Sequence, residues 1–121
     1  MSENYDFGKK GEEIAQTFLK QKGYSILATN WHHRHKEVDI IAEKNNFLII
    51  VEVKSRSNTI HELPQDAVTK KKQRFLIEAA NAYVEKNNVD LEVQFDIITV
   101  VKHDDKYKVR HIKDAFYPIV K

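Results

Sequence analysis

Two apolar segments joined by a pair of asparagines constrain the fold more than any other feature of the sequence. Residues 37–43 and 47–54 are rich in Val and Ile, and Asn45-Asn46 lies between them. Asparagine tolerates the left-handed backbone that a two-residue hairpin turn requires. The run Phe47 to Val51 is apolar on both faces of its strand, which is typical of a strand inside a sheet. The pattern therefore predicts an antiparallel hairpin whose second strand is interior.

The predicted hairpin carries a candidate metal site at its open end. If it closes symmetrically, Asp39 faces Glu52 and Glu37 faces Lys54. Opposed carboxylates repel each other unless a cation or proton intervenes, so Asp39, Glu52 and the carbonyl of Val53 are predicted to hold Mg²⁺ or Mn²⁺. Lys54 shares the face of Glu52 and could orient a water there. The opposite face is wholly apolar and is expected to be buried; it comprises Val38, Ile40, Ala42, Ile49, Val51 and Val53.

A purely structural interpretation of these residues is also open. The charged side chains could form cross-strand ion pairs on a solvated sheet face. The apolar run before Glu52 favours the metal site instead, because charges at the end of an interior strand are partly desolvated.

The remaining sequence predicts two helices and three further strands. One helix spans about 7–22 and is stopped by Gly23, and another follows Thr69 as N-cap and runs to about 86. Strands are expected at 24–29, 91–101 and 107–112, with a polar, His-rich loop at 30–36. The order α-β-β-β-α-β-β in 121 residues predicts a single α/β domain, residues 1–121, in which helices flank a mixed central sheet.

Composition excludes several classes of protein. There is no cysteine, hence no disulfide framework or thiolate metal site, and no apolar run is long enough to cross a membrane. We therefore expect a cytoplasmic protein.

The net charge is only +2, but positively charged side chains gather in three segments of the chain. The residues predicted to contact nucleic acid are Arg34, His35, Lys36, Arg56 and Lys72. Zinc bound by His32, His33 and His35 is the weaker interpretation of that loop, because a structural zinc site needs a fourth ligand.

The segment Val38-Asp39, a hairpin, and then Glu52-Val53-Lys54 resembles the D…(D/E)XK signature of the PD-(D/E)XK nuclease superfamily. Over nearly the whole chain the sequence is similar to a family of small bacterial proteins related to archaeal Holliday junction resolvases. The matching segments are Gly11-Glu12, Gly23-Tyr24, Asn30-Trp31, Glu37 to Ile41, Val51 to Arg56, Ala67-Val68 with Lys72, Phe95-Asp96 and Ala115-Phe116. Two positions depart from the family pattern, because Lys36 and the segment His61 to Pro64 stand where glycine is usual.

This resemblance implies a restriction-endonuclease-like fold and roles for four of the matching residues. Asp39 and Glu52 would bind the metal, Lys54 would be the catalytic lysine, and Glu12 would be an acidic residue supplied by the first helix. Helical periodicity places Glu12 near the buried face of that helix and Glu13 in solvent. A boundary residue in a surface ion pair is the alternative for Glu12.

The same periodicity turns Lys72 toward the sheet and Lys70 and Lys71 away from it. Lys72 could contact a phosphate at the start of its helix, or its stem could simply cover the core. Trp31 is expected in the core rather than stacked on a base.

The predicted function is a metal-dependent endonuclease that hydrolyses DNA, with branched DNA as the substrate suggested by the resolvase relationship. The alternatives are a catalytically silent DNA-binding or protein-interaction module and a purely structural partner protein. A homodimer is expected if the substrate requires paired cuts.

Overall fold

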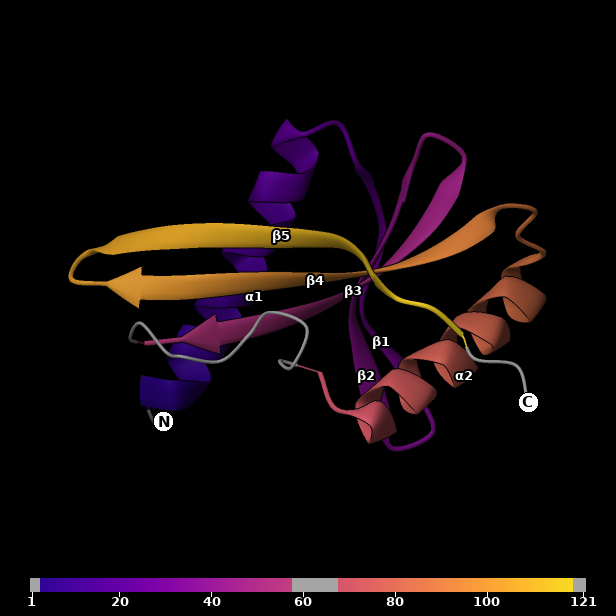
Figure 1. The fold of residues 1–121 in the computed structure, drawn as a ribbon, viewed down its shortest axis with the longest axis horizontal. Coiled ribbons are helices and arrows are strands. Elements are labelled where there is room, and N and C mark those ends of the chain that lie inside the picture. The colour runs from indigo at the N-terminus through magenta and orange to yellow at the C-terminus, as the bar shows by residue number, and fades with distance from the viewer. Residues whose placement is uncertain (1–2, 58–67, 119–121) are drawn as a thin grey trace.

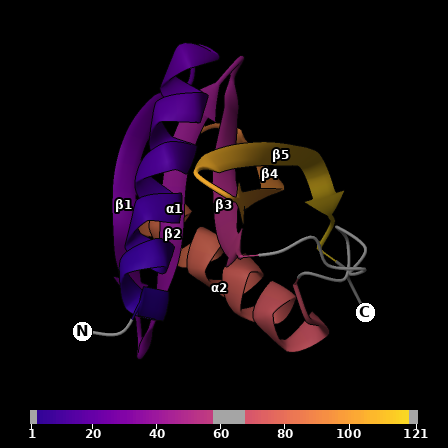
Figure 2. The same cartoon turned by 90° about the vertical axis from the view of Figure 1, so that its left-hand side faces the viewer.

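Two helices pack on opposite faces of a five-stranded sheet (Figures 1 and 2). The structure is a computed structural model and describes residues 3–57 and 68–118. Its elements are α1 (Glu3–Gln21), β1 (Ser25–His33), β2 (Lys36–Lys44), β3 (Phe47–Arg56), α2 (Lys70–Asn87), β4 (Glu92–His103) and β5 (Lys106–Phe116). The predicted α/β class and element order are confirmed.

The sheet is mixed, with the strands in chain order from β1 to β5. Only β3 and β4 are parallel, because α2 lies between them in the chain and returns it across the sheet. The other neighbours are antiparallel and are joined by short turns. No helix in the described ranges is long and apolar enough to cross a membrane.

Each helix covers its own hydrophobic core. On one face Leu76 of α2 packs in a cluster with Ile50 of β3, and on the other Leu19 of α1 packs in a cluster with Val51. Adjacent residues of β3 thus enter opposite cores, because side chains alternate along a strand. The predicted interior position of β3 is confirmed.

Local signals explain where the elements end. Asn45 and Asn46 have φ of 53° and 69° and close the β2–β3 hairpin as predicted. The Thr69 hydroxyl accepts a hydrogen bond from the Lys72 amide at 3.1 Å and caps α2. Asn88 ends the same helix in the left-handed region, with φ of 52°.

The predicted loop at 30–36 was wrong over most of its length. β1 continues to His33 and β2 begins at Lys36, so only Arg34 and His35 form the turn. Trp31 pairs with Val38 in the ladder and packs against the α2-side core, as expected for a core residue. The polar composition of this segment reflects the end of an edge strand rather than a loop.

The predicted hairpin register was correct only near the turn. β2 pairs with β3 from Lys44–Phe47 to Ile40–Val51, and the expected pairs Asp39–Glu52 and Glu37–Lys54 do not form. The sequence also predicted that Val38 and Ile40 lie on one apolar face of the hairpin. In the structure Val38 joins the core beneath α2, whereas Ile40 joins the core beneath α1. The segment His61 to Pro64 lies outside the described residues.

Candidate active site at the fork between β2 and β3

The candidate site lies where β2 and β3 separate. Beyond Ile40–Val51, β2 continues beside β1 only, while β3 continues beside β4 to Arg56 (Figure 1). Because β2 has departed, the Val53 amide has no backbone partner on that side, and Asp39 Oδ2 accepts its hydrogen bond at 2.8 Å. The fork thus turns the Asp39 carboxyl toward β3.

Glu12 reaches this fork from α1. Its Oε1 accepts a hydrogen bond from Asn30 Nδ2 of β1 at 2.9 Å. Gly11 brings the helix close to the sheet, because a Cβ at that position would overlap Ser55 Oγ of β3. Glu12 is half-buried and Glu13 is exposed, as the helical periodicity predicted.

Three carboxyl groups therefore share one region of low dielectric. The pKa of Asp39 is raised from 3.8 to about 8, first by burial and then by the negative charge of Glu52. The Val53 amide lowers this pKa, whereas the Glu12 charge and a side-chain hydrogen bond with Glu52 raise it further. Burial and the neighbouring negative charges therefore favour the protonated form of the Asp39 carboxyl.

Glu52 is only 4% exposed, and its two oxygens have different surroundings. Oε2 lies 3.3 Å from Lys54 Nζ and 3.7 Å from Lys72 Nζ. Oε1 is buried and has no hydrogen-bond partner within the described ranges. A buried carboxylate oxygen without a partner is costly, so this atom is suited to a cation.

The side chains present fit a hard divalent cation. Asp39 and Glu52 supply carboxylate oxygens, and a cation would offset both the burial and the Glu52 charge that raise the Asp39 pKa. Residues 3–57 and 68–118 contain no cluster of three or more His, Asp or Glu side chains arranged as metal ligands. Such a cation would consequently need main-chain oxygen or water to complete its coordination, as Mg²⁺ usually does.

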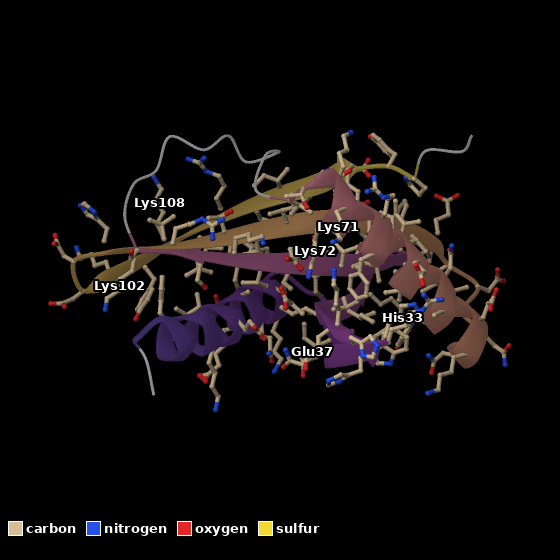
Figure 3. All side chains as sticks on the ribbon, turned by 90° about the horizontal axis from the view of Figure 1, so that it is seen from below. His33, Glu37, Lys71, Lys72, Lys102 and Lys108 are labelled. Atoms are coloured by element: carbon tan, nitrogen blue, oxygen red, sulfur yellow. The ribbon has the colours of Figure 1, made fainter. Side chains whose placement is uncertain are left out.

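Four of the predicted nucleic-acid contacts lie beside α2. Arg34 Nε pairs with Glu78 Oε1 at 3.1 Å, while Lys36 Nζ and Lys72 Nζ lie 5.6 and 5.3 Å from the centre of the Phe75 ring. A surface pocket of about 290 Å³ adjoins them, lined by His33, Arg34, His35, Lys36, Lys71, Arg74, Phe75 and Glu78. Figure 3 shows Lys71 and Lys72 at the start of α2.

The remaining predicted contact, Arg56, lies on β3 beyond the fork and not beside α2. It is the last residue of β3, and its Nη1 donates to the Ser55 carbonyl at 3.1 Å. Lys72 connects the two regions, because it contacts both Glu52 and Phe75. As predicted, Lys70 and Lys71 are exposed and Lys72 is half-buried.

Sequence reasoning missed Asn30 as a site residue. It has φ of 47° and lies between the Thr29–Ile40 and Trp31–Val38 pairs, opposite Asp39. In the sequence, Asn30 has significance only as part of the Asn30-Trp31 segment that resembles the nuclease-related family. A polar residue tolerant of the left-handed region was the available signal.

Asp96, which belongs to one of the segments that carry the resemblance, has a structural role and is not part of the candidate site. Its carboxylate accepts hydrogen bonds from the Asp114 amide at 2.9 Å and from Gln94 at 3.0 Å, and His111 Nε2 lies 2.7 Å away. Asp114, with φ of 55°, lies where the β4–β5 register shifts. Asp96 therefore holds an irregular segment of β5 against β4.

Comparison with known proteins identifies relatives over almost the full chain. A family model described as "Uncharacterised protein family UPF0102" matches residues 11–100. A UPF0102 protein of Flavobacterium psychrophilum is 50% identical over 117 residues, which cover 97% of this chain and 98% of the relative. A UPF0102 protein of Phocaeicola vulgatus is 52% identical over 118 residues, which cover 98% of each.

Proposed function

The chain belongs to the uncharacterised protein family UPF0102, and from this premise we propose that it is a metal-dependent endonuclease acting on DNA. One observation carries the proposal: the buried Oε1 of Glu52 beside Asp39, which has no hydrogen-bond partner among the described residues, with the Lys54 ammonium on the same carboxylate. Carboxylates and a lysine arranged around a cation suit phosphodiester hydrolysis.

Asp39 and Glu52 would hold Mg²⁺ or Mn²⁺, with the Val53 carbonyl as the proposed further ligand. When bound, the cation would supply positive charge to the phosphodiester and make a nearby water more acidic. The Val53 amide orients Asp39 for this purpose through its hydrogen bond. Asn30 holds Glu12 beside the same carboxyl group.

Lys54 is the proposed catalytic lysine. Its ammonium contacts Glu52 Oε2, and its side chain is 27% exposed, so it remains accessible to a substrate. There it can orient the attacking water and stabilise negative charge that develops on the phosphate. Lys72, similarly 28% exposed, can bind a phosphate oxygen from the α2 side.

The contacts of Glu52 also favour a second candidate function. Two ammonium groups already offset its charge, so the site can persist without a metal. The protein would then be a silent module that binds DNA without cleaving it. A two-fold dimer, which would provide paired active sites, stays a prediction.

Cleavage assays distinguish these functions. Purified protein is incubated with supercoiled plasmid and with a synthetic four-way junction, in Mg²⁺, in Mn²⁺ and in chelator. We expect metal-dependent cutting that falls about 100-fold or more in Glu52→Gln and Lys54→Met. Lys70→Met, an exposed lysine of α2, is the matched control and should cut like the wild type.

Intact DNA with every metal, together with retained binding, would favour the silent module. Protein that neither binds nor cuts DNA would contradict both candidate functions. Circular dichroism of each variant separates a lost site from a lost fold.

A further inference from the structure

The β4–β5 hairpin carries three positively charged side chains on one face. In the antiparallel register Arg110 pairs with Thr99, Lys108 with Val101, and Lys106 with His103. Thr99 and Val101 in turn lie beside Lys54 and Arg56 in the parallel β3–β4 register. Because paired residues share a face, Lys54, Thr99 and Arg110 form a line of side chains across the sheet, from the proposed catalytic lysine to the edge strand β5. Lys108 and Lys106 continue from Arg110 along β5, and we call these three β5 residues the row.

The intervening residues of β5 face α1. The Tyr107 ring lies 6.2 Å from that of Phe7, Val109 packs against the α1-side core, and the His111 ring lies 5.8 Å from that of Phe18. The three cations therefore point to the opposite face, which is the face that α2 covers elsewhere in the sheet.

The α2-side core does not extend beneath these cations. Its members on this hairpin reach Ile97 and Ile112 and go no further toward the turn. Lys106, Lys108 and Arg110 are exposed. In the part of the chain that the structure describes, none of the three forms an ion pair or a side-chain hydrogen bond.

We propose that Lys106, Lys108 and Arg110 form a backbone-binding surface for DNA that leads away from the active site, an inference that rests on the proposed function. Successive members lie about 7 Å apart along the strand, so the row spans about 14 Å. Each DNA strand carries a phosphate about every 3.4 Å of helix axis, so a row of this length can span several consecutive phosphates. Asp104 and Asp105 form the turn beyond its far end.

Positively charged side chains that form no ion pair with the described residues suit this role better than Arg34 and Lys72 near α2. Arg34 is already bound to Glu78, and Lys72 to Glu52, so a phosphate would have to replace existing partners there. On β5 the phosphate replaces only water and counterions, whose release favours binding.

The hairpin itself supplies the matched control. Lys102 pairs with Tyr107, whose ring lies beside Phe7 of α1, and Lys102 and Lys108 lie on opposite sides of the hairpin (Figure 3). Lys102 is exposed like Lys108, and its replacement changes the net charge equally. Any difference between them therefore reports position rather than total charge.

The test measures affinity for a labelled duplex by fluorescence anisotropy in chelator, so that cleavage cannot interfere. We expect Lys108→Gln to bind at least about threefold more weakly and to reduce the slope of log affinity against log salt by about one, and Lys108→Gln/Arg110→Gln to enlarge both effects. Lys102→Gln should remain within about twofold of the wild type.

Equal losses in Lys102→Gln and Lys108→Gln, or no loss in either, would overturn this surface while leaving the proposed nuclease intact. Absence of any DNA binding by the wild type would instead overturn the proposed function and, with it, this inference. A variant that binds weakly yet melts like the wild type excludes misfolding.

Discussion

Asp39 is the residue at which fold and site meet. Its Oδ2 satisfies the Val53 amide that the departure of β2 leaves without a backbone partner. Burial, and after it the charges of Glu52 and Glu12, raise the pKa of the same carboxyl to about 8. One side chain therefore completes the backbone hydrogen bonding of the fork and contributes negative charge for a cation.

Replacing Asp39 tests this electrostatic conflict through stability. The folded protein retains a proton on Asp39 that the unfolded chain releases near its ordinary value of 3.8. The free energy of unfolding of metal-free protein should therefore fall as pH rises from about 4 to about 8 and level off above. In Asp39→Asn, which keeps an oxygen for Val53, this fall should weaken and stability at pH 8 should increase by about 1 to 3 kcal/mol.

Urea unfolding at pH 5 and pH 8 measures the effect. Glu13→Gln, an exposed carboxyl on the same helix as Glu12, serves as the control. A pH dependence that is identical in Asp39→Asn and wild type would contradict the raised pKa.

At the scale of elements, α1 owes its position to Gly11. The absence of a Cβ there lets the helix approach Ser55 of β3 and brings Glu12 to the fork. Gly8 is three residues earlier on the same helix, and a Cβ there would meet nothing within 4 Å. The two glycines therefore differ in packing and not in secondary structure.

Alanine at each glycine separates packing from helix propensity. Gly8→Ala should stabilise the protein by about 0.5 to 1 kcal/mol, because alanine loses less conformational freedom in a helix. Gly11→Ala should destabilise it by about 1 to 3 kcal/mol and lower cleavage, because α1 must move away from β3. Thermal melting and the plasmid assay check both expectations; equal stabilisation by the two alanines would show that α1 does not depend on this close approach.

At the scale of the whole molecule, the site joins the two layers of helix. Glu12 comes from α1, Lys72 from α2, and Asp39 and Glu52 from the sheet between them. A cation bound here would act on the stability of the entire domain, because it binds the folded chain and not the unfolded one.

Divalent cations should therefore raise the melting temperature. With Mg²⁺ or Mn²⁺ well above its dissociation constant at pH 8, we expect an increase of about 3 to 8 °C. Glu52→Gln should abolish the increase, whereas Glu13→Gln should preserve it. Differential scanning calorimetry with and without chelator measures the shift, and an unchanged wild-type melting temperature would count against a metal at the fork.

Much of the architecture was predictable from local signals. Asn45-Asn46 identified the turn, the apolar run after it identified β3 as interior, and Thr69 marked the start of α2. Helical periodicity correctly distinguished Glu12 from Glu13 and Lys72 from its neighbours. These features depend on backbone preference and on the periodicity of apolar side chains along one element, and a short stretch of residues is enough to reveal both.

The tertiary structure alone decided where β2 leaves β3. A symmetric hairpin predicted Asp39 directly opposite Glu52, but pairing ends at Ile40–Val51. Beyond that point β2 stays with β1, and β3 stays with β4, its parallel partner across the α2 crossover. Which neighbour a strand keeps depends on hydrogen bonds and packing from segments far apart in sequence, so no local pattern reports it. The sequence by itself determined which residues carry charge and which face of a helix they occupy, and long-range pairing determined which of them meet.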